Sequence, residues 1–225
     1  MNTLVPLSGP VADRPAEMLV VLALLAVVPA ALVTLTSFLK ISVVLSIARS
    51  ALGAPQVPPT TAVTGLALVL TAIVMTPVGE ASLAAIRAAP AGRGAAASLA
   101  AVERGFGPLR AFLARHARPD DRAAFLDVAV RLRGPSSAAP APAADDLAVL
   151  APAFVVSELR RAFTLGFLVF VPFLAVDLVV SNVLLALGLT QLSPSSVSLP
   201  FKLLLFVAVD GWKLLARALA LSYAG

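Results

Sequence analysis

Long uncharged segments dominate this chain. Residues 18–39 and 50–79 contain no charged side chain, and Asp177 is the only charged residue between Arg161 and Lys202. A run of about 20 apolar residues is long enough to cross the hydrocarbon core of a bilayer as one helix. The pattern therefore predicts membrane-type helices over 18–39, 61–78, 162–189 and 199–221. The apolar pattern of the first continues to Arg49, and the third is either one very long helix or a helix pair.

These helices pair into two hydrophobic hairpins, at 18–79 and 148–225. A short segment, 1–17, precedes the first hairpin, and a soluble insertion, 80–147, separates the two. The predicted fold class is an all-α membrane-type protein. Prolines inside the runs predict kinks at Pro29 and Pro172 and a helix end at Pro77, since a proline within a helix removes a hydrogen bond and clashes with the preceding turn.

The insertion has a different composition, rich in Ala, Arg, Gly and Pro. Residues 88–101 and 134–144 resemble flexible low-complexity linkers. Between them, the apolar spacing over 109–132 predicts two short amphipathic helices. The second begins at Pro119, with Asp120 or Asp121 as its cap or first-turn acid.

The composition supports a membrane protein and argues against a disulfide-bonded, metal-binding or nucleic-acid-binding protein. Hydrophobic residues make up 60% of the 225 residues and charged residues 13%, against about 25% charged in soluble domains. With no Cys and a single His, His116, disulfides, thiolate metal sites and Cys nucleophiles are excluded, and no cofactor is indicated. The net charge of +5 is not a nucleic-acid signal, because nine Arg and seven acids mix over residues 79–150.

The last apolar run carries four charges, Lys202, Asp210, Lys213 and Arg217. At roughly 100° per residue in one continuous helix, all four fall within about 80° of arc. A charge at the bilayer centre costs about 3 kcal/mol or more, so this stripe is expected to face protein or water. The alternative is that Lys213 and Arg217 extend out of the helix end to the membrane surface, which leaves Asp210 unexplained.

Three further features stand out within the apolar runs. An isolated Asp177 is costly unless paired, which favours a functional or inter-helix role. Lys40 is either an anchor at the membrane surface or the buried partner of a carboxylate. Four phenylalanines at helical spacing are expected to pack against other helices: Phe163, Phe167, Phe170 and Phe173.

The charge stripe favours a subunit of a membrane assembly, and these residues leave two other functions open. Intramembrane Asp and Lys fit a multi-pass solute or ion channel or transporter. An aspartate-based intramembrane hydrolase would use Asp177 and Asp210 as a pair sharing a proton, although neither has a recognisable catalytic surround.

Several long motifs resemble the FliP/SctR family of type III secretion export-apparatus proteins. The first block contains Thr36-Ser-Phe-Leu-Lys-Ile and Met75-Thr-Pro. The second block contains Ala153-Phe-Val-Val-Ser-Glu-Leu-Arg, Asp177-Leu-Val-Val-Ser-Asn and Ser198-Leu-Pro-Phe-Lys-Leu-Leu-Leu-Phe-Val-Ala-Val-Asp-Gly-Trp. The resemblance covers about residues 18–80 and 148–216, and the insertion matches no motif.

The resemblance implies a homopentameric, non-enzymatic subunit of the export gate in the bacterial inner membrane. Its implied partners are the small hairpin subunit and the single-copy subunit of the same apparatus. Together they would form a helical channel for unfolded secreted polypeptides, raised out of the bilayer plane toward the periplasm. The motifs at Lys40 and Asp177, and the absence of a signal-peptide pattern, look more like the virulence-associated injectisome branch than the flagellar one.

Two expectations about sites follow from the resemblance. Where the family usually has a run of methionines that closes the pore, this chain has Leu189-Thr190-Gln191, followed by Leu192. Methionine is soft and adaptable, so either Leu189 and Leu192 replace that closure or a partner subunit supplies it. Glu158 and Lys202 are expected to pair across neighbouring subunits. Asp177 and Asp210 are candidate partners for Lys40, Lys213 or Arg217.

Overall fold

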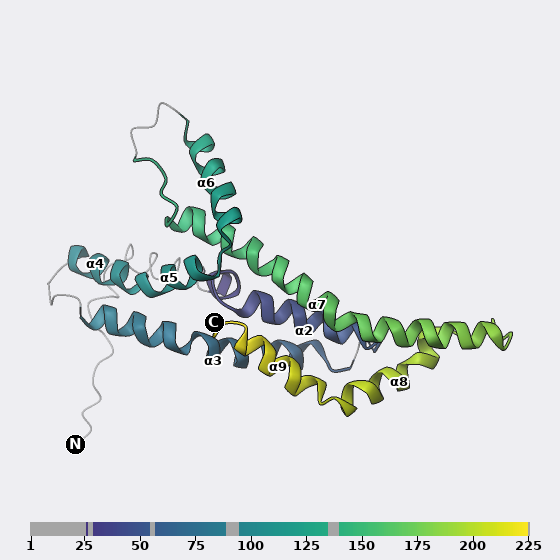
Figure 1. Cartoon of the computed structure of the whole chain (residues 1–225). Helices are drawn as coiled ribbons and strands as arrows, with labels where there is room; N and C mark the ends of the chain where they lie inside the picture. Colours follow the sequence, from purple (N-terminus) through teal and green to yellow (C-terminus); the bar gives the residue numbers. More distant parts are fainter. Residues whose placement is uncertain (1–25, 27–28, 55–56, 89–94, 135–139, 225) are drawn as a thin grey trace, which may run out of the picture.

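The computed structural model describes residue 26 and residues 29–54, 57–88, 95–134 and 140–224. Every regular element in these residues is a helix, which confirms the all-α fold class (Figure 1). The helices are α2 Phe38–Ala51, α3 Thr60–Arg87, α4 Ala95–Gly105, α5 Gly107–His116, α6 Pro119–Arg133, α7 Leu147–Ala186, α8 Pro194–Ala208 and α9 Gly211–Leu221.

The core forms around α2, which lies along α7 in the most extensive helix contact of the molecule. The fully buried residues of α2 recur at spacings of three and four: Ile41, Val44, Leu45 and Ala48. This spacing places them on one face of the helix. Gly166 allows the close approach, because a Cβ at this position would overlap the Ile47 side chain of α2.

The remaining helices pack around this pair. α3 runs beside α2, α8 folds back on α7, and α9 lies against α3 (Figure 1). The second half of α7 and α8 extend away from the rest as a long arm, which we call the α7–α8 arm (Figure 1).

The prediction that Pro77 ends its helix is wrong, because α3 continues to Arg87 with Pro77 inside it. The Thr76 hydroxyl donates to the Ala72 carbonyl at 2.7 Å in the turn where the proline interrupts the backbone pattern. Beyond Pro77, α3 packs against α4 and α5. This tertiary packing offsets the cost of the proline, about 3 kcal/mol.

Helix α7 is a single helix of 40 residues that contains both Pro152 and Pro172. At 1.5 Å per residue it is about 60 Å long, roughly twice the thickness of a hydrocarbon core. The ribbon changes direction partway along α7, as expected for a proline-containing helix (Figure 1). Gly188, with a φ of 71°, follows its C-terminus in the left-handed conformation that glycine adopts most easily.

The expected continuous helix over 199–221 is also wrong. α8 begins at Pro194 and ends at Ala208, and α9 begins at Gly211. Between them Asp210 has a φ of 52°, which breaks the helix. A Cβ on Gly211 would overlap the ring of Phe206, so glycine allows the chain to turn tightly around this ring. The predicted charge stripe therefore does not exist, since it required one unbroken helix.

The two amphipathic helices predicted in the insertion are observed as α5 and α6, and α6 begins at Pro119 with Asp120 and Asp121 in its first turn. Part of the first predicted linker is instead helical, in α4. Residues 89–94 and 135–139 of the two linkers lie outside the described residues.

Most of the helix predicted over 18–39 also lies outside the described residues. Within them, 29–34 are helical and the chain bends at 35–37 before α2 begins. The expected kink at Pro29 falls beside residues that are not described.

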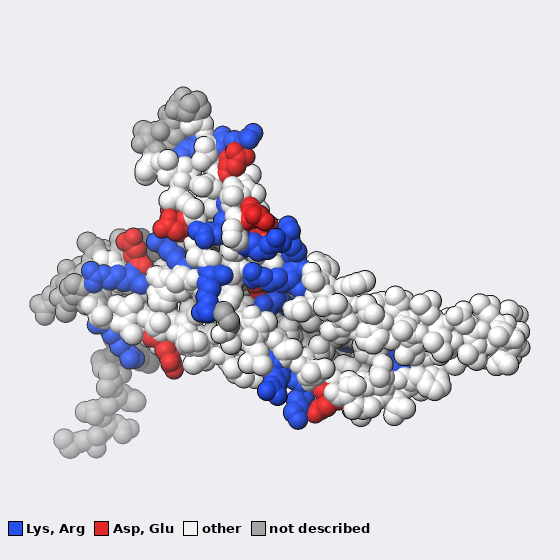
Figure 2. Space-filling model, viewed as in Figure 1, with Lys and Arg blue, Asp and Glu red and all other residues white. Residues whose placement is uncertain are grey.

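Two of the described helices, α3 and α7, are long and apolar enough to cross a membrane. Only 17% and 11% of their most apolar windows are buried by the described residues, whereas the core helix of a soluble protein is mostly buried. Figure 2 shows the same division on the surface: charges gather over α5, α6 and the start of α7, and the α7–α8 arm is almost free of charge.

Candidate functional site: two buried ion-pair clusters and an exposed hairpin tip

The first buried cluster, which we call the central cluster, contains Lys40, His116, Glu158, Arg161 and Tyr223. Glu158 is fully buried, and Lys40 is 1% exposed. The Lys40 Nζ lies 3.3 Å from the Glu158 Oε2, and the Arg161 Nη1 lies 2.7 Å from the Oε1. The Tyr223 hydroxyl donates to the Oε2 as well. Glu158 therefore connects α2, α7 and the C-terminal segment.

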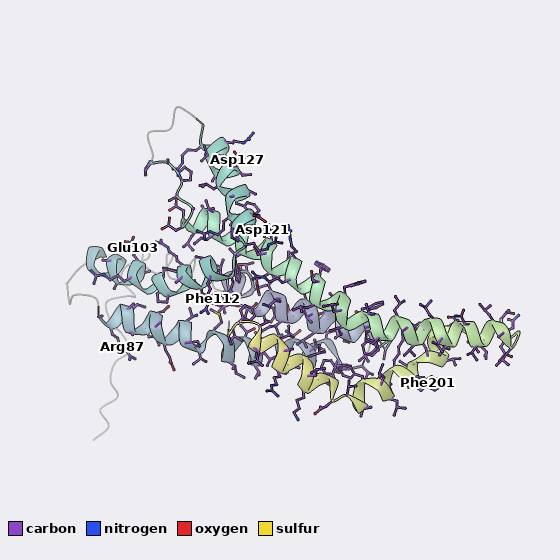
Figure 3. The ribbon with its side chains drawn as sticks, in the orientation of Figure 1. Arg87, Glu103, Phe112, Asp121, Asp127 and Phe201 are labelled. Atoms are coloured by element: carbon purple, nitrogen blue, oxygen red, sulfur yellow. The ribbon has the colours of Figure 1, made fainter. Side chains whose placement is uncertain are left out.

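Aromatic rings enclose this cluster. The Lys40 Nζ lies 3.5 Å from the ring centroid of Tyr223, a cation–π contact. The His116 ring meets the Tyr223 ring edge-on at 5.0 Å, and Phe112 lies 4.6 Å from His116. Figure 3 labels Phe112 on the side of α5 that faces the neighbouring helices. Because Lys40 and Glu158 are almost fully buried, their attraction is stronger than that of an ion pair in water.

Two pKa shifts follow from this environment. Burial and the Glu158 carboxylate raise the pKa of Tyr223, so its hydroxyl stays protonated and donates to that carboxylate. Burial lowers the pKa of His116 below its usual value of 6.5, so the neutral imidazole is favoured.

We predict that His116 makes the protein less stable in mild acid. As the pH falls through 6.5, the unfolded chain binds a proton that the folded chain excludes, and the free energy of unfolding falls. The loss is at most about 1.4 kcal/mol per pH unit for one proton. Thermal unfolding at pH 7.5, 6.5 and 5.5 measures it. His116→Phe keeps the ring packing and should remove the part of the acid destabilisation that comes from His116. If the stability of both proteins changes with pH in the same way, the prediction is wrong.

The second buried cluster, which we call the arm cluster, joins α7 to α8. The Lys202 Nζ lies 2.6 Å from the Asp177 Oδ2, and the Ser198 hydroxyl donates to the Oδ1 at 2.6 Å. Lys202 is 4% exposed and Ser198 fully buried. The ammonium also lies near Gly53, just beyond the C-terminus of α2. A cation is favoured there by the helix dipole.

The structure gives Lys40 its buried carboxylate partner, Glu158, and gives Asp177 a partner that we did not expect, Lys202. Glu158 and Lys202 thus each have an intrachain partner, and their pairing across subunits stays a prediction. Asp210 pairs with Lys213 at 3.4 Å, but both side chains are more than two-thirds exposed, so this pair contributes little. Arg217 is exposed on α9.

The structure does not place all four expected phenylalanines in the core. Phe173 is 4% exposed, but Phe163 and Phe167 are more than 60% exposed on α7. They are available to partners or lipid.

Charge exchange distinguishes the two pairings of Lys202. We expect Asp177→Lys and Lys202→Asp each to lower the melting temperature of the chain, because each places two like charges side by side where position 202 is buried and position 177 is 30% exposed. Combining them should restore part of the loss, since the opposite charges meet again. Thermal unfolding in detergent measures this. If the exchange Glu158→Lys with Lys202→Glu restores stability instead, the pairing across subunits is correct.

Sequence reasoning missed a third polar contact. Asp121, considered only as a cap or first-turn acid, is 7% exposed and accepts a hydrogen bond of 2.7 Å from the buried Ser157 hydroxyl. The Arg118 backbone N–H donates to the same hydroxyl, and Arg160 lies 3.4 Å from Asp121. Figure 3 shows Asp121 where α6 meets α7. Only Ser157, a small polar residue next to Glu158 in an apolar run, hinted at this contact.

The expected constriction loop lies at the tip of the α7–α8 arm, between the two helices (Figure 1). Leu189 and Leu192 are 44% and 48% exposed, and Thr190 and Gln191 are also exposed. The tip therefore presents two apolar side chains that the described residues leave about half exposed.

The two aspartates of the hydrolase hypothesis each have a lysine partner in the structure. Asp177 and Asp210 each pair with a lysine, so they do not form the proton-sharing pair that the hydrolase reading requires. Among the described residues, no group of three or more His, Asp or Glu could hold a metal ion.

Comparison with known proteins places the chain in a family. Residues 21–219 match the FliP family. The chain is 43% identical to the Yop proteins translocation protein R of Yersinia pestis, over 93% of this chain and 96% of that protein. It is 40% identical to the hypersensitivity response secretion protein HrcR of Ralstonia nicotianae, over 92% and 97%.

A flagellar relative is as similar. The chain is 44% identical to the flagellar biosynthetic protein FliP of Pectobacterium carotovorum, over 92% of this chain and 78% of that protein. Since the family match covers the tip of the α7–α8 arm and every member of the two ion-pair clusters except Tyr223, this chain belongs to the FliP family.

Proposed function

We propose that this chain is a core subunit of the export gate of a type III secretion system. Five copies assemble with the small hairpin subunit and the single-copy subunit of the apparatus. Together they form a helical channel through which unfolded polypeptides leave the cell, in and above the bacterial inner membrane. The family and the secretion and translocation roles named for its relatives support this proposal.

The observation that carries the proposal is the α7–α8 arm. Its surface is almost free of charge (Figure 2), and most of its apolar side chains are exposed in the single chain. A contiguous apolar surface of this extent requires lipid or protein partners. Because α7 is about twice as long as a bilayer core is thick, assembly above the membrane plane fits its length.

Native mass spectrometry tests the assembly. The protein is co-expressed with the genes adjacent to its own and purified in mild detergent. We expect one mass for a five-fold ring that carries two smaller hydrophobic partner subunits. A stable monomer or dimer without partners would contradict the proposal and favour the channel or transporter, which flux measurements on small solutes would then test.

The virulence-associated branch is the more specific proposal, supported by the motifs at Lys40 and Asp177. Complementation tests it. The gene should restore protein secretion to an injectisome mutant that lacks its R subunit and should not restore motility to a flagellar mutant that lacks FliP. The reverse result would place the chain in the flagellar branch.

In the assembled channel, Leu189 and Leu192 seal the pore where the family usually has methionines. We expect Leu189→Ser with Leu192→Ser to raise the ion leak through the resting complex several-fold, because hydroxyl side chains let water wet the constriction. Conductance of the reconstituted complex measures this, with Thr190→Ser as the control. An unchanged leak would assign the closure to a partner subunit.

A further inference from the structure

One side of α7 carries a row of exposed apolar residues, which we call the α7 stripe: Phe163, Phe167, Val171, Leu174 and Leu178. Their side chains are between 42% and 64% exposed. A spacing of three or four residues places all five on one side of the helix, over a length of about 23 Å. The α7 stripe is therefore a continuous apolar ridge.

The opposite side of α7 forms one wall of an apolar groove. This groove has a volume of about 350 Å³ and lies between α7 and α9, and its lining includes Leu165, Leu214 and Ala218. At roughly 100° per residue, Phe163 and Phe167 each lie about 160° around the helix axis from Leu165. The α7 stripe and the groove thus lie on opposite sides of one helix.

A second apolar groove lies farther along the same side of α7. It has a volume of about 560 Å³ between α7 and α8, and it includes Val183, which is 18 residues beyond Leu165. Eighteen residues are five full helical turns, so both residues face the same way. The two grooves together accompany the α7 stripe along its length. A rotation about an axis parallel to α7 would therefore bring the stripe of one copy against the grooves of another without a shift along the axis.

The groove between α7 and α9 has room for the two phenylalanines of the stripe. A cavity of about 150 Å³ in another protein binds one benzene molecule, so about 350 Å³ accommodates two phenyl rings. Phe163 and Phe167 are four residues apart and hence neighbours on the helix surface, about 5–6 Å from each other. The pair can enter the groove side by side.

The area of such a contact is that of a specific interface. An aromatic side chain presents about 150–250 Å² and an aliphatic one about 60–120 Å². At the exposed fractions given above, the α7 stripe presents roughly 400 Å² of apolar surface. The groove side would bury a similar area, and about 40% of a typical interface is polar. The contact would then bury roughly 1,300 Å² in total, within the range of specific protein interfaces.

Charged side chains beside both surfaces argue against lipid as the occupant. Asp210 and Lys213 on α9 are more than two-thirds exposed, and Arg217 is exposed as well. Figure 2 shows basic and acidic side chains together over α9. On α7, the side chain of Arg160 is 56% exposed, one turn before Phe163. Lipid tails over the groove and the stripe would place these charges against hydrocarbon, at about 3 kcal/mol each. A protein partner avoids this cost.

We propose that the α7 stripe of one copy of this chain seats in the two grooves of a neighbouring copy. The rings of Phe163 and Phe167 lie between α7 and α9 of that neighbour. Because the stripe and the grooves are different surfaces, each copy uses one toward each neighbour, and repetition of the contact closes a ring. This inference rests on the proposed function, which requires a ring of identical subunits, and it names the surfaces that join them.

Cysteine cross-linking tests the contact directly, because the chain has no cysteine of its own. Two differently tagged chains, one with Phe167→Cys and one with Leu214→Cys, are co-expressed with the adjacent genes and oxidised in the membrane. We expect a disulfide-linked pair that carries both tags, since the contact brings the two positions together. A single chain with both substitutions should give a ladder of cross-linked species up to the complete ring.

The matched control replaces Phe167→Cys by Leu178→Cys. Leu178 is 57% exposed on the same side of α7 as Phe167, but about 16 Å farther along the helix. A disulfide requires Cα atoms within about 7 Å of each other. We therefore expect Leu178→Cys to cross-link to Leu214→Cys at least about tenfold less than Phe167→Cys does.

Two variants remove the contact from opposite sides. Phe163→Ala with Phe167→Ala removes the rings, and Ala218→Phe fills the groove. Each should lower the association constant of one contact at least about 30-fold, as expected for loss of a central aromatic anchor. Native mass spectra over a dilution series measure this. The melting temperature of the isolated chain should change little, because these side chains are exposed. Leu204→Ala, 68% exposed on α8 outside both grooves, should leave the ring intact.

The results separate this inference from the proposed function. If the wild-type ring forms but Phe167→Cys and Leu214→Cys do not cross-link, the inference is wrong and the proposed function stands. Intact rings in both disrupting variants would have the same meaning. Cross-links that stop at dimers would show a two-fold contact and would contradict both, as would a wild-type chain that forms no ring.

Discussion

Replacing Glu158 by Gln is expected to lower the free energy of unfolding of this protein by about 3–5 kcal/mol. Glu158 is fully buried and binds Lys40, Arg161 and Tyr223 together. Gln removes the negative charge and leaves the buried Lys40 without a counter-charge. Removing one partner of a buried pair costs about 3–5 kcal/mol. In a chain of this size that lowers the melting temperature by on the order of 10 °C.

Thermal unfolding of the purified chain and its level in membranes measure the effect. Asp127→Asn is the matched control, because Asp127 forms an exposed pair with Arg131 at 2.7 Å. Its expected effect is below about 1 kcal/mol. If Glu158→Gln melts within a degree or two of the wild type, the central cluster does not stabilise the fold.

A second variant separates the lost charge from the lost packing. Lys40→Met with Glu158→Gln removes both charges of the buried pair and keeps the side-chain lengths. We expect it to be more stable than Glu158→Gln alone, because no lysine is left without a counter-charge beside Arg161. Equal stability of the two variants would mean that the Lys40–Glu158 contact contributes nothing by itself.

Gly211→Ala is expected to have the second-largest effect. The new Cβ would overlap three atoms of the Phe206 ring, which packs in the core against Trp212 and Phe173. A ring held on several sides cannot rotate away, so the break between α8 and α9 must open. Overpacking of this kind costs about 1–3 kcal/mol, measured as a lower melting temperature.

The matched control is Gly65→Ala in α3, where a Cβ would meet nothing within 4 Å. Alanine is the better helix former by about 0.5–1 kcal/mol, so this variant should be as stable as the wild type or slightly more stable. Phe206→Leu should relieve part of the damage when combined with Gly211→Ala. If Gly211→Ala is neutral, the ring does not fix the turn at Asp210.

The positions of the helices could be predicted from the sequence only where residues close together in the chain determine them. The apolar spacing of α5 and the Pro119-Asp-Asp start of α6 act within a few residues, and both predictions were correct. The predicted ends of α3 and α8 were wrong because contacts with residues outside the local sequence pattern decide where these helices end. α3 continues past Pro77 where α4 and α5 pack on it, and the chain breaks at Asp210 where Gly211 lies against Phe206.

The same division holds for the charges. The sequence by itself determined that Asp177 needs a partner, since an unpaired charge in an apolar run is too costly to keep, and it left Lys40 as either a surface anchor or the partner of a carboxylate. Only the tertiary structure decided which partners they have. Lys40 and Glu158 are more than one hundred residues apart and meet because α2 packs along α7, whereas Asp177 and Lys202 meet across one hairpin. Coulomb attraction selects a partner only after packing has brought the two charges within a few ångströms.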